Sequence, residues 1–382
     1  MKHLRFFFSD RYSLLIGLVF SLNSLVLATW VVRIPEIKNE LFLSEGDLGL
    51  ALLGPPLGAL CMLPFAGWII SYLQSGRAMV VSMGLYVMSL VWIAFSRDFW
   101  SFSFALFYFG LTNSFMDISM NSAAAVREKQ VKSSIMSTCH GMWSMGAMVG
   151  SLLGSLAVGF DIEMDVHFAL VLVVEVLFLS LFGRSLSNSY RTEQKGKRRL
   201  AIPNATLLSL SLMAFCIMLA EGAIADWSSL YMDQTLDSVP FLIGAAYASY
   251  SLIMAFGRFA GDAIIPGFGK RPVVLFGGIV ATLGLGSTLL AGNEYYAIIG
   301  FGLTGLGYSC VIPVLFSSAA NEPGYTQGAG IAAVSSLGYI GFLAGPPAIG
   351  FLADNYGLQV GLGLVVLLSM MVAAIAAFVR FR

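Results

Sequence analysis

Charged side chains are scarce in this sequence. Only 11% of its 382 residues are Asp, Glu, Lys or Arg, whereas a soluble domain carries about 25%. So few charges cannot cover a water-exposed surface. Hydrophobic residues make up 58% of the chain, and the mean hydropathy is +0.83. The composition therefore excludes a pair of soluble domains and indicates an integral membrane protein.

Cysteine and histidine are also rare, with four and three copies. All four cysteines lie in apolar runs, so no disulfide framework in loops is indicated. The sequence has no pair of metal-ligating motifs and no glycine-lysine loop of the kind that holds phosphates. We therefore expect no metal, no cofactor, no ATP-driven step and no enzymatic activity. Basic and acidic residues balance at 21 each, which gives no indication of a nucleic-acid partner.

Long apolar runs are abundant. Each holds about 20 residues and can cross about 30 Å of hydrocarbon as a helix. They lie at about residues 12–32, 48–70, 78–96, 99–125, 135–159, 167–186, 205–231, 240–265, 272–291, 295–319, 327–352 and 358–379. The first run is longer than the apolar core of a signal peptide, and we interpret it as an uncleaved span.

Basic residues determine the expected orientation of these twelve spans. If the N-terminus is cytoplasmic, 17 of the 21 basic residues fall on the cytoplasmic side. Arg33, Lys38 and Arg97 fall on the other side, and Arg258 lies within a span. Basic residues accumulate in cytoplasmic loops of membrane proteins. The pattern therefore predicts that both termini are cytoplasmic.

The chain contains an internal repeat. Phe109-Gly110-Leu111-Thr112 in span 4 matches Phe301-Gly302-Leu303-Thr304 in span 10. Gly146-x-x-x-Gly150 in span 5 matches Gly341-x-x-x-Gly345 in span 11. The matches occur in the same order in both halves, which indicates a parallel repeat of six spans. Repeats of this kind are typical of transporters.

The repeat predicts the domain organisation. We expect an N-terminal six-helix half at residues 1–186, a cytoplasmic linker at 187–203 and a C-terminal six-helix half at 204–382. The linker is polar and basic, and we expect it to lie in water near anionic lipid.

Loop motifs at the inner ends of the spans resemble those of the major facilitator superfamily. They are Gly76-Arg77 in the first half and Gly257-Arg258-Phe259-Ala260-Gly261-Asp262, followed by Gly269-Lys270-Arg271, in the second. Asp117-x-x-x-Asn121, His140-x-x-Trp143 and the segment Ala220–Trp227 are similar to the fucose-permease-like, YbjJ-like bacterial branch of that superfamily.

The resemblance implies the fold and the way it works. It implies an all-α membrane protein with twelve helices in two pseudo-symmetric six-helix halves, working by alternating access in the bacterial inner membrane. It also implies that spans 1, 4, 7 and 10 line the central cavity, and that an acidic residue on span 4 takes part in proton coupling.

Acidic residues inside the spans are candidate functional groups, because each costs at least ~2.5–3.5 kcal/mol in hydrocarbon. Asp117 lies on span 4 and Glu221 on span 7. We interpret Asp117, His140 and Glu221 as the proton-coupling residues. The alternative for Asp117 and His140 is a structural hydrogen-bond cluster between spans 4 and 5. Glu175, on the peripheral span 6, is expected to be protonated or paired with a neighbouring helix.

Neutral polar residues on the inner spans predict the kind of solute. An uncharged lining with aromatic side chains suits a small hydroxylated solute such as a sugar, and no Lys or Arg is expected at mid-membrane. The candidate solute-binding residues are Asn23, Asn113, Asn121, Glu221, Tyr308, Ser309 and Tyr339. Two alternatives stay open: an efflux antiporter for amphipathic compounds, and a membrane enzyme or non-transporting sensor. Span 5 lacks the proline typical of drug-efflux carriers.

Two gates complete the interpretation. We expect an outer gate with an ion pair between Arg33 and Asp226 and with two tryptophans, Trp30 and Trp227, although tryptophans also occur at this depth as interfacial anchors. The candidate inner-gate residues are Gly76, Arg77, Arg258, Gly261, Asp262 and Arg271. The expected partners are the small solute and the lipid bilayer. We expect a monomer that uses the proton gradient.

Overall fold

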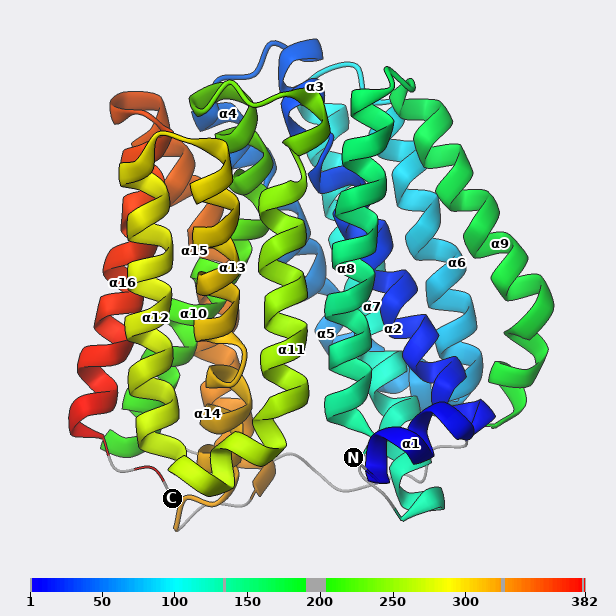
Figure 1. The fold of residues 1–382 in the computed structure, drawn as a ribbon. Coiled ribbons are helices and arrows are strands. Elements are labelled where there is room, and N and C mark those ends of the chain that lie inside the picture. The colour runs from blue at the N-terminus through cyan, green and yellow to red at the C-terminus, as the bar shows by residue number, and fades with distance from the viewer. Residues whose placement is uncertain (1, 133–134, 190–203, 324–326, 380, 382) are drawn as a thin grey trace. The chain divides into compact units, whose positions relative to one another are not determined.

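The computed structural model describes residues 2–132, 135–189, 204–323, 327–379 and 381, and these are almost entirely helical (Figure 1). The chain forms two compact units. Unit one comprises Met1–Leu43 and Leu50–Lys195, and unit two comprises Ser44–Gly49 and Gly196–Arg382. Most of the predicted linker, residues 190–203, lies outside the described residues.

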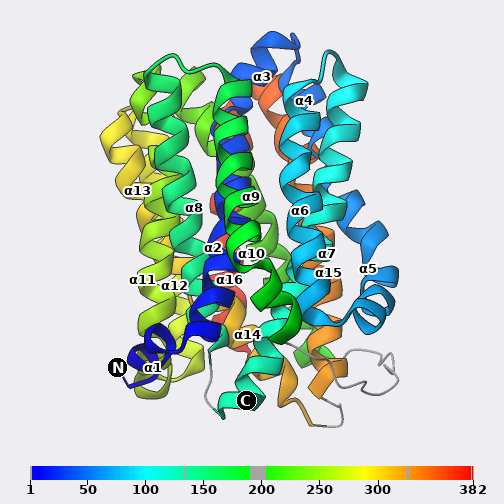
Figure 2. The same cartoon turned by 90° about the vertical axis from the view of Figure 1, so that its right-hand side faces the viewer.

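The helices of the first half are α1 (Lys2–Ser9), α2 (Arg11–Val31), α3 (Ile34–Glu40), α4 (Glu45–Ala51), α5 (Gly54–Leu73), α6 (Ser75–Ala94), α7 (Phe99–Val131), α8 (Met136–Gly159) and α9 (Met164–Ser189). The long helices among them run up and down in alternation, with the short helix α1 at their lower end and the short helices α3 and α4 at their upper end (Figures 1 and 2).

The second half is built in the same way. It contains α10 (Ala205–Leu230), a π-helical turn (Tyr231–Thr235), a 3-10 turn (Pro240–Leu242), α11 (Ala245–Phe268), α12 (Lys270–Ala291), α13 (Glu294–Tyr308), α14 (Val311–Ala320), α15 (Gln327–Tyr356) and α16 (Leu358–Phe378).

In the described part of the chain, eleven helical segments are long and apolar enough to cross a membrane. Some of them join two consecutive elements, such as α13 with α14. The helix α7 is also long enough, with 33 residues, but it carries Asn113, Asp117 and Asn121, which lower its hydropathy. With α7 included, the structure has the twelve spans that the sequence predicts.

Side-chain caps show how the sequence starts these helices. The first N–H groups of a helix have no partner within it. Asp10 caps α2 by accepting from the Ser13 amide at 2.9 Å, and Asp98 caps α7 through the Ser101 amide at 2.8 Å. The backbone and hydroxyl bonds from Ser101 also lower the pKa of Asp98. Polar residues that flank the apolar runs therefore mark where the spans begin.

The packing inside the two units repeats. In unit one, α2 packs on α8, α5 and α6 pack on α7, and α6 packs on α9. In unit two, the corresponding helices pair in the same way: α10 with α15, α11 and α12 with α13, and α12 with α16. The sequence repeat is therefore also a repeat of helix neighbours.

Glycines of the repeat make equivalent close contacts. A Cβ atom added at Gly146 would lie 2.0 Å from the Ser21 carbonyl oxygen, and one at Gly341 would lie 2.4 Å from that of Phe215. Each contact joins the first and fifth spans of its half. Helices in lipid associate through such close backbone approach, because lipid provides no hydrophobic drive between them.

This packing can be tested at one glycine. Gly146→Ala should destabilise unit one by about 1–3 kcal/mol, because the added methyl group overlaps the Ser21 carbonyl. Gly67→Ala is the matched control, because a Cβ at that helical position meets no atom within 4 Å. Thermal unfolding of the purified protein measures both effects. Equal melting temperatures for the two variants would contradict the packing argument.

Candidate solute and proton sites

A polar cluster joins three helices of unit one. Asn23 of α2 is 3% exposed. Its side-chain amide donates to the Asn113 oxygen on α7 at 2.8 Å, and its own oxygen accepts from the Trp143 indole on α8 at 2.9 Å. An Asn side chain can donate two bonds and accept two. Asn23 therefore fixes the position of Asn113 and Trp143 and retains hydrogen-bonding capacity.

Asp117, the acidic residue of span 4, lies about one turn beyond Asn113 on α7. The Asn121 side chain donates to the Asp117 carboxylate at 3.0 Å and also to the Asp117 backbone carbonyl at 2.9 Å. Among the described residues, this amide is the polar partner of the carboxylate. In the described part of the chain, Asp117 is thus held by a neutral amide and forms no ion pair.

The predicted partner of Asp117, His140 on α8, has a different neighbour. Its ring meets Phe20 of α2 edge to face, with the centroids 5.4 Å apart. The hydrogen bond to the carboxylate comes from Asn121 instead. A relay role for His140 remains a prediction.

Unit two contains an ion pair that the sequence analysis did not anticipate. The Arg258 guanidinium of α11 lies 3.9 Å from the Glu221 carboxylate of α10, and 15% and 21% of the two side chains are exposed. The expectation that no cation lies at mid-membrane remains a prediction, but Arg258 does reach a candidate solute-binding residue. A long arginine side chain reaches further along the span than its Cα position indicates.

Two tyrosines are stacked on α11, the helix that carries Arg258. The rings of Tyr247 and Tyr250 lie 6.0 Å apart and nearly parallel, and both side chains are buried. Such a stack adjoining the Glu221–Arg258 pair offers an aromatic face together with charged hydrogen-bonding groups.

The other candidate solute-binding residues of unit two are engaged in packing. The Tyr308 hydroxyl is 2.5 Å from that of Ser369 on α16, and the Ser309 hydroxyl donates to the Leu306 carbonyl at 2.7 Å. Tyr339 on α15 is half-buried.

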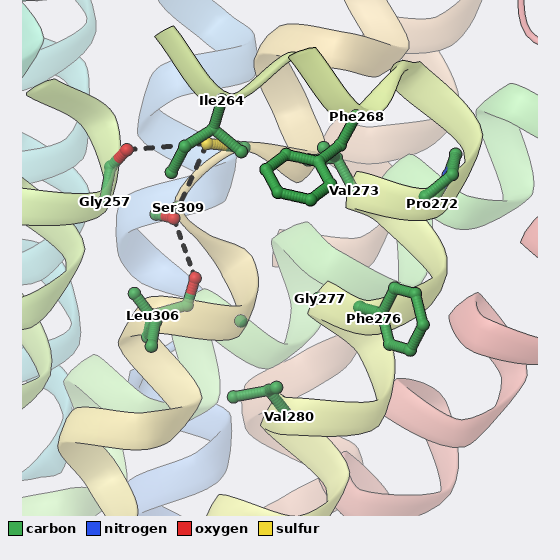
Figure 3. Close-up of a pocket in the computed structure, with 12 residues that line it drawn as sticks. Gly257, Ile264, Phe268, Pro272, Val273, Phe276, Gly277, Val280, Leu306 and Ser309 are labelled. Atoms are coloured by element: carbon green, nitrogen blue, oxygen red, sulfur yellow. Dashed lines mark hydrogen bonds between the residues drawn. The ribbon is translucent and has the colours of Figure 1, made fainter. Parts of the chain in front are cut away.

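An apolar cavity of about 250 Å³ lies against Ser309, between α11, α12 and α13 (Figure 3). Its polar groups already have partners: Ser309 donates to Leu306, and the Cys310 thiol lies 3.5 Å from the Gly257 carbonyl oxygen. Apolar side chains such as Phe268, Phe276 and Val280 complete the lining. The cavity therefore offers contacts to apolar groups only.

Three of the four candidate outer-gate residues are buried, and Asp226 is half-buried. Arg33 is 2% exposed and bonds within unit one: it pairs with Glu36, donates to the Ile162 carbonyl at 2.6 Å and donates to the His167 ring at 3.4 Å. Its three nitrogens are thus occupied. The predicted pair of Arg33 with Asp226 would join the two units and remains a prediction.

The two gate tryptophans are each among the largest fully buried side chains. Trp30 packs edge to face on Phe109, with the ring centroids 5.6 Å apart. Trp227 of α10 has no exposed surface.

The candidate inner-gate residues have separate local roles. A Cβ at Gly76 would lie 2.3 Å from the Leu186 carbonyl oxygen, so this glycine permits α6 to approach α9. Arg271 donates to the Ala376 carbonyl of α16 at 3.2 Å. Gly261 faces the Cys310 sulfur, and the Arg77 side chain is exposed. The side chain of Asp262 lies outside the described residues, and the gate itself remains a prediction.

An ion pair also joins the last turns of α7 to the start of α2 in unit one. Arg127, near the end of α7, donates to both oxygens of Asp10, at 2.6 and 2.8 Å, and lies over the Tyr12 ring. Burial alone would raise the pKa of Asp10, but hydrogen bonds from Arg127 and Ser13 outweigh it and lower that pKa.

Comparisons with known proteins agree with this architecture. The family model of the Major Facilitator Superfamily matches residues 13–320 and 210–382. The membrane protein MosC of Rhizobium meliloti is 32% identical over 370 residues, which cover 94% of this chain and 88% of MosC. An uncharacterised MFS-type transporter of Yersinia pestis is 30% identical, with 94% and 93% covered.

The chain belongs to the Major Facilitator Superfamily, and it is a transporter rather than an enzyme. Solved structures show the same fold. A bacterial homolog of the human lysosomal transporter Spinster, in an inward-facing conformation, superposes with a TM-score of 0.73 at 17% identity, with 95% of each chain covered. The transporter FucP, in its outward conformation, gives 0.64 at 15% identity, with 96% of this chain and 98% of FucP covered.

Some site residues were missed by the sequence analysis. Trp143 was recognised only as part of a family motif. Its indole N–H is a hydrogen-bond donor, and such a donor usually needs an acceptor inside a protein, which was the signal that could have found it. Glu36 and His167 hold Arg33. Glu36 stands three residues after Arg33, a spacing that the sequence shows, whereas His167 is 134 residues away and no spacing connects it to Arg33. A buried arginine requires such partners, so the missing signal was the burial of Arg33.

The Asp10–Arg127 pair gives a pH-dependent prediction. Because the folded-state pKa of Asp10 is lowered, the pair stabilises the protein above about pH 4, the unfolded value, and this stabilisation is lost as the pH falls through the folded pKa. Asp10→Asn should therefore lower the melting temperature at pH 7 by an amount equivalent to about 1 kcal/mol or less. The difference from the wild type should vanish in acid. The exposed Asp161→Asn is the control, and a deficit that persists unchanged in acid would contradict the prediction.

The Glu221–Arg258 pair can be tested by a double-mutant cycle. Glu221→Gln removes the carboxylate that faces the half-buried Arg258. This change should cost more than Arg258→Gln, since a lone carboxylate can take up a proton. The double variant should recover part of the loss, with a coupling energy within about 0.5–3 kcal/mol. Thermal unfolding gives the four values. As a control, Glu163→Gln and Lys129→Gln change two exposed residues, and their losses of stability should simply add in the double variant. If the losses at Glu221 and Arg258 also add, the pair is not formed.

Proposed function

We propose that this transporter is a proton-coupled secondary carrier of a small, polar, sugar-like solute. The observation that carries the proposal is the pairing of neutral and acidic polar groups on the predicted cavity-lining helices of unit one. Asn23 and Asn113 form the neutral cluster on α2 and α7, and Asp117 with Asn121 forms the acidic group on α7.

The neutral cluster supports solute recognition. Amide groups both donate and accept, so they suit the hydroxyl groups of a sugar, which do the same. In unit two, Glu221 and Arg258 neutralise each other, and the Tyr247–Tyr250 stack offers an aromatic face. A paired acid and base can also bind hydroxyl groups without requiring a charged solute. Both units thus favour a polar solute without net charge.

The acidic group supports proton coupling. A carboxyl group that is held by an amide in a low-dielectric surrounding can exist protonated or ionised, and the balance changes with exposure to water. Alternating access changes that exposure. Asp117 would take up a proton on one side of the membrane and release it on the other, and the movement of α7 would connect this step to the Asn113 contact with Asn23.

We propose that the protein lies in the bacterial inner membrane, as the resemblance to bacterial transporters implies. Both termini would lie in the cytoplasm, because the predicted inner loops carry most of the Lys and Arg. Direct support would come from reporter fusions at the two ends of the chain.

Efflux of amphipathic compounds is the second candidate function. The apolar cavity beside Ser309 favours it, because this cavity offers contacts to an apolar group only. A thermal-unfolding screen at two pH values separates the two functions. A ligand at 100 times its Kd adds about 2.7 kcal/mol to the folded state. Sugars should raise the melting temperature, and the shift should depend on pH. Stabilisation by amphipathic cations alone would favour efflux.

The role of Asp117 can be tested in proteoliposomes. Asp117→Asn should abolish solute accumulation driven by a pH gradient, because an amide cannot exchange a proton, whereas solute exchange without a gradient should continue. Asp98→Asn is the matched control at the exposed start of the same helix, where Asn caps as well as Asp does. Gradient-driven accumulation that survives in Asp117→Asn would show that the coupling proton binds elsewhere.

A further inference from the structure

Unit one contains a second buried carboxyl group, in the middle of α9. Glu175 is 1% exposed, and neither of its carboxyl oxygens has a hydrogen-bond partner in the described structure. Its neighbours Val173, Val174 and Val176 are about half exposed on the outside of the helix. The glutamate side chain therefore points into the unit, although the rest of this stretch faces outward.

The helices packed around Glu175 provide no cation near it. α9 packs on α6 and α2, and Figure 2 shows α9 in front of α2 with α6 beside it. The described charged and titratable residues of these three helices, apart from Glu175, are Arg11 and Tyr12 on α2, Arg77 and Tyr86 on α6, and Asp165, His167 and Arg184 on α9. The basic residues among them lie toward the helix ends. His167 and Arg184 are eight and nine residues from Glu175 on α9, and Arg11 and Arg77 are in the first turns of α2 and α6.

An ionised carboxylate without a partner is too costly in this position. Glu175 therefore carries a proton in the arrangement that the structure shows. A protonated carboxyl group that lacks a hydrogen-bond acceptor still costs free energy when it is buried. A leucine of similar size would avoid this cost, so packing alone does not explain the glutamate. A glutamate at this point gains a partner only if the packing around it changes.

We propose that Glu175 is a second proton-binding site of unit one, separate from Asp117. It holds a proton in the arrangement described and releases it to water when α9 moves away from α6 and α2. The step is a simple transfer in which the O–H bond of the carboxyl group breaks, the carboxylate keeps the electron pair and a water molecule becomes hydronium. This inference extends the proposed proton coupling and rests on it for its role in transport.

The outer end of α9 contains a group that fits this role. His167 is 4% exposed, its Nδ1 accepts from Arg33 at 3.4 Å, and its Nε2 has no partner in the described residues. Eight residues separate it from Glu175, which is about 12 Å along a helix. That distance excludes direct transfer, so water must enter between the two for a proton to pass.

The connection to the solute site runs through α2. This helix packs on α9 and also holds Asn23, the residue that binds Asn113 and Trp143. A displacement of α9 that exposes Glu175 would therefore move one of the helices of the polar cluster. Proton release at Glu175 and solute contact at Asn23 would then favour different arrangements of unit one.

Infrared spectroscopy of the purified protein in lipid tests the proton site without any solute. The wild type should show a carbonyl band of a protonated carboxyl group that shifts on transfer to D2O. Glu175→Gln should remove this band, whereas Asp117→Asn and the exposed Glu163→Gln should retain it. Should Glu175→Gln fail to fold, Glu175→Asp keeps a carboxyl group, and its band should move rather than vanish. A band that is unchanged in Glu175→Gln, or that does not exchange in D2O, would overturn the proposal.

Transport then separates the two proton sites. Glu175→Gln should retain the thermal stabilisation by solute but change the pH dependence of uptake, because the amide resembles the protonated form at every pH. An unchanged pH profile in this variant would contradict a role of Glu175 in coupling. If Asp117→Asn transports normally while the infrared band of Glu175 exchanges, the proposed role of Asp117 fails and the Glu175 site stands.

Discussion

Close approach of helix backbones is the constraint on which the rest of the structure depends. In lipid, helices gain nothing from hiding apolar side chains from water, so packing contacts must hold them together. Gly146 against Ser21 and Gly341 against Phe215 provide such contacts at equivalent places in the two units. They fix α2 on α8 and α10 on α15, and thereby set where Asn23 and Glu221 stand.

Much of this fold could be predicted because its signals are local. Apolar runs of about 20 residues define spans, whereas the orientation that the basic residues indicate stays a prediction. The repeated Gly-x-x-x-Gly motifs predicted equivalent helices, and the structure shows these glycines at equivalent contacts. The Asp117 and Asn121 pair was also accessible, since residues four apart share a helix face.

Most of the contacts that were missed join residues far apart in the chain. Trp143 and Asn23 are 120 residues apart, and Arg258 reaches Glu221 from another helix. The depth of an arginine head group depends on side-chain length and direction, which the position of a Cα along a span does not reveal. Tyr308 and Ser309 were predicted to bind solute, but the structure shows them bonded within the protein. Their polarity suggested solute contact, but their hydroxyl groups bond to Ser369 and Leu306.

The length of α7 has a mechanical consequence. Its 33 residues extend about 50 Å, well beyond the ~30 Å of hydrocarbon that a span must cross. Asp117 and Arg127 stand ten residues apart on this one rigid rod, about 15 Å along its axis. A tilt of α7 would therefore move Asp117 together with the Arg127–Asp10 ion pair. The length of this helix thus ties a half-buried carboxyl group and a distant ion pair to one element.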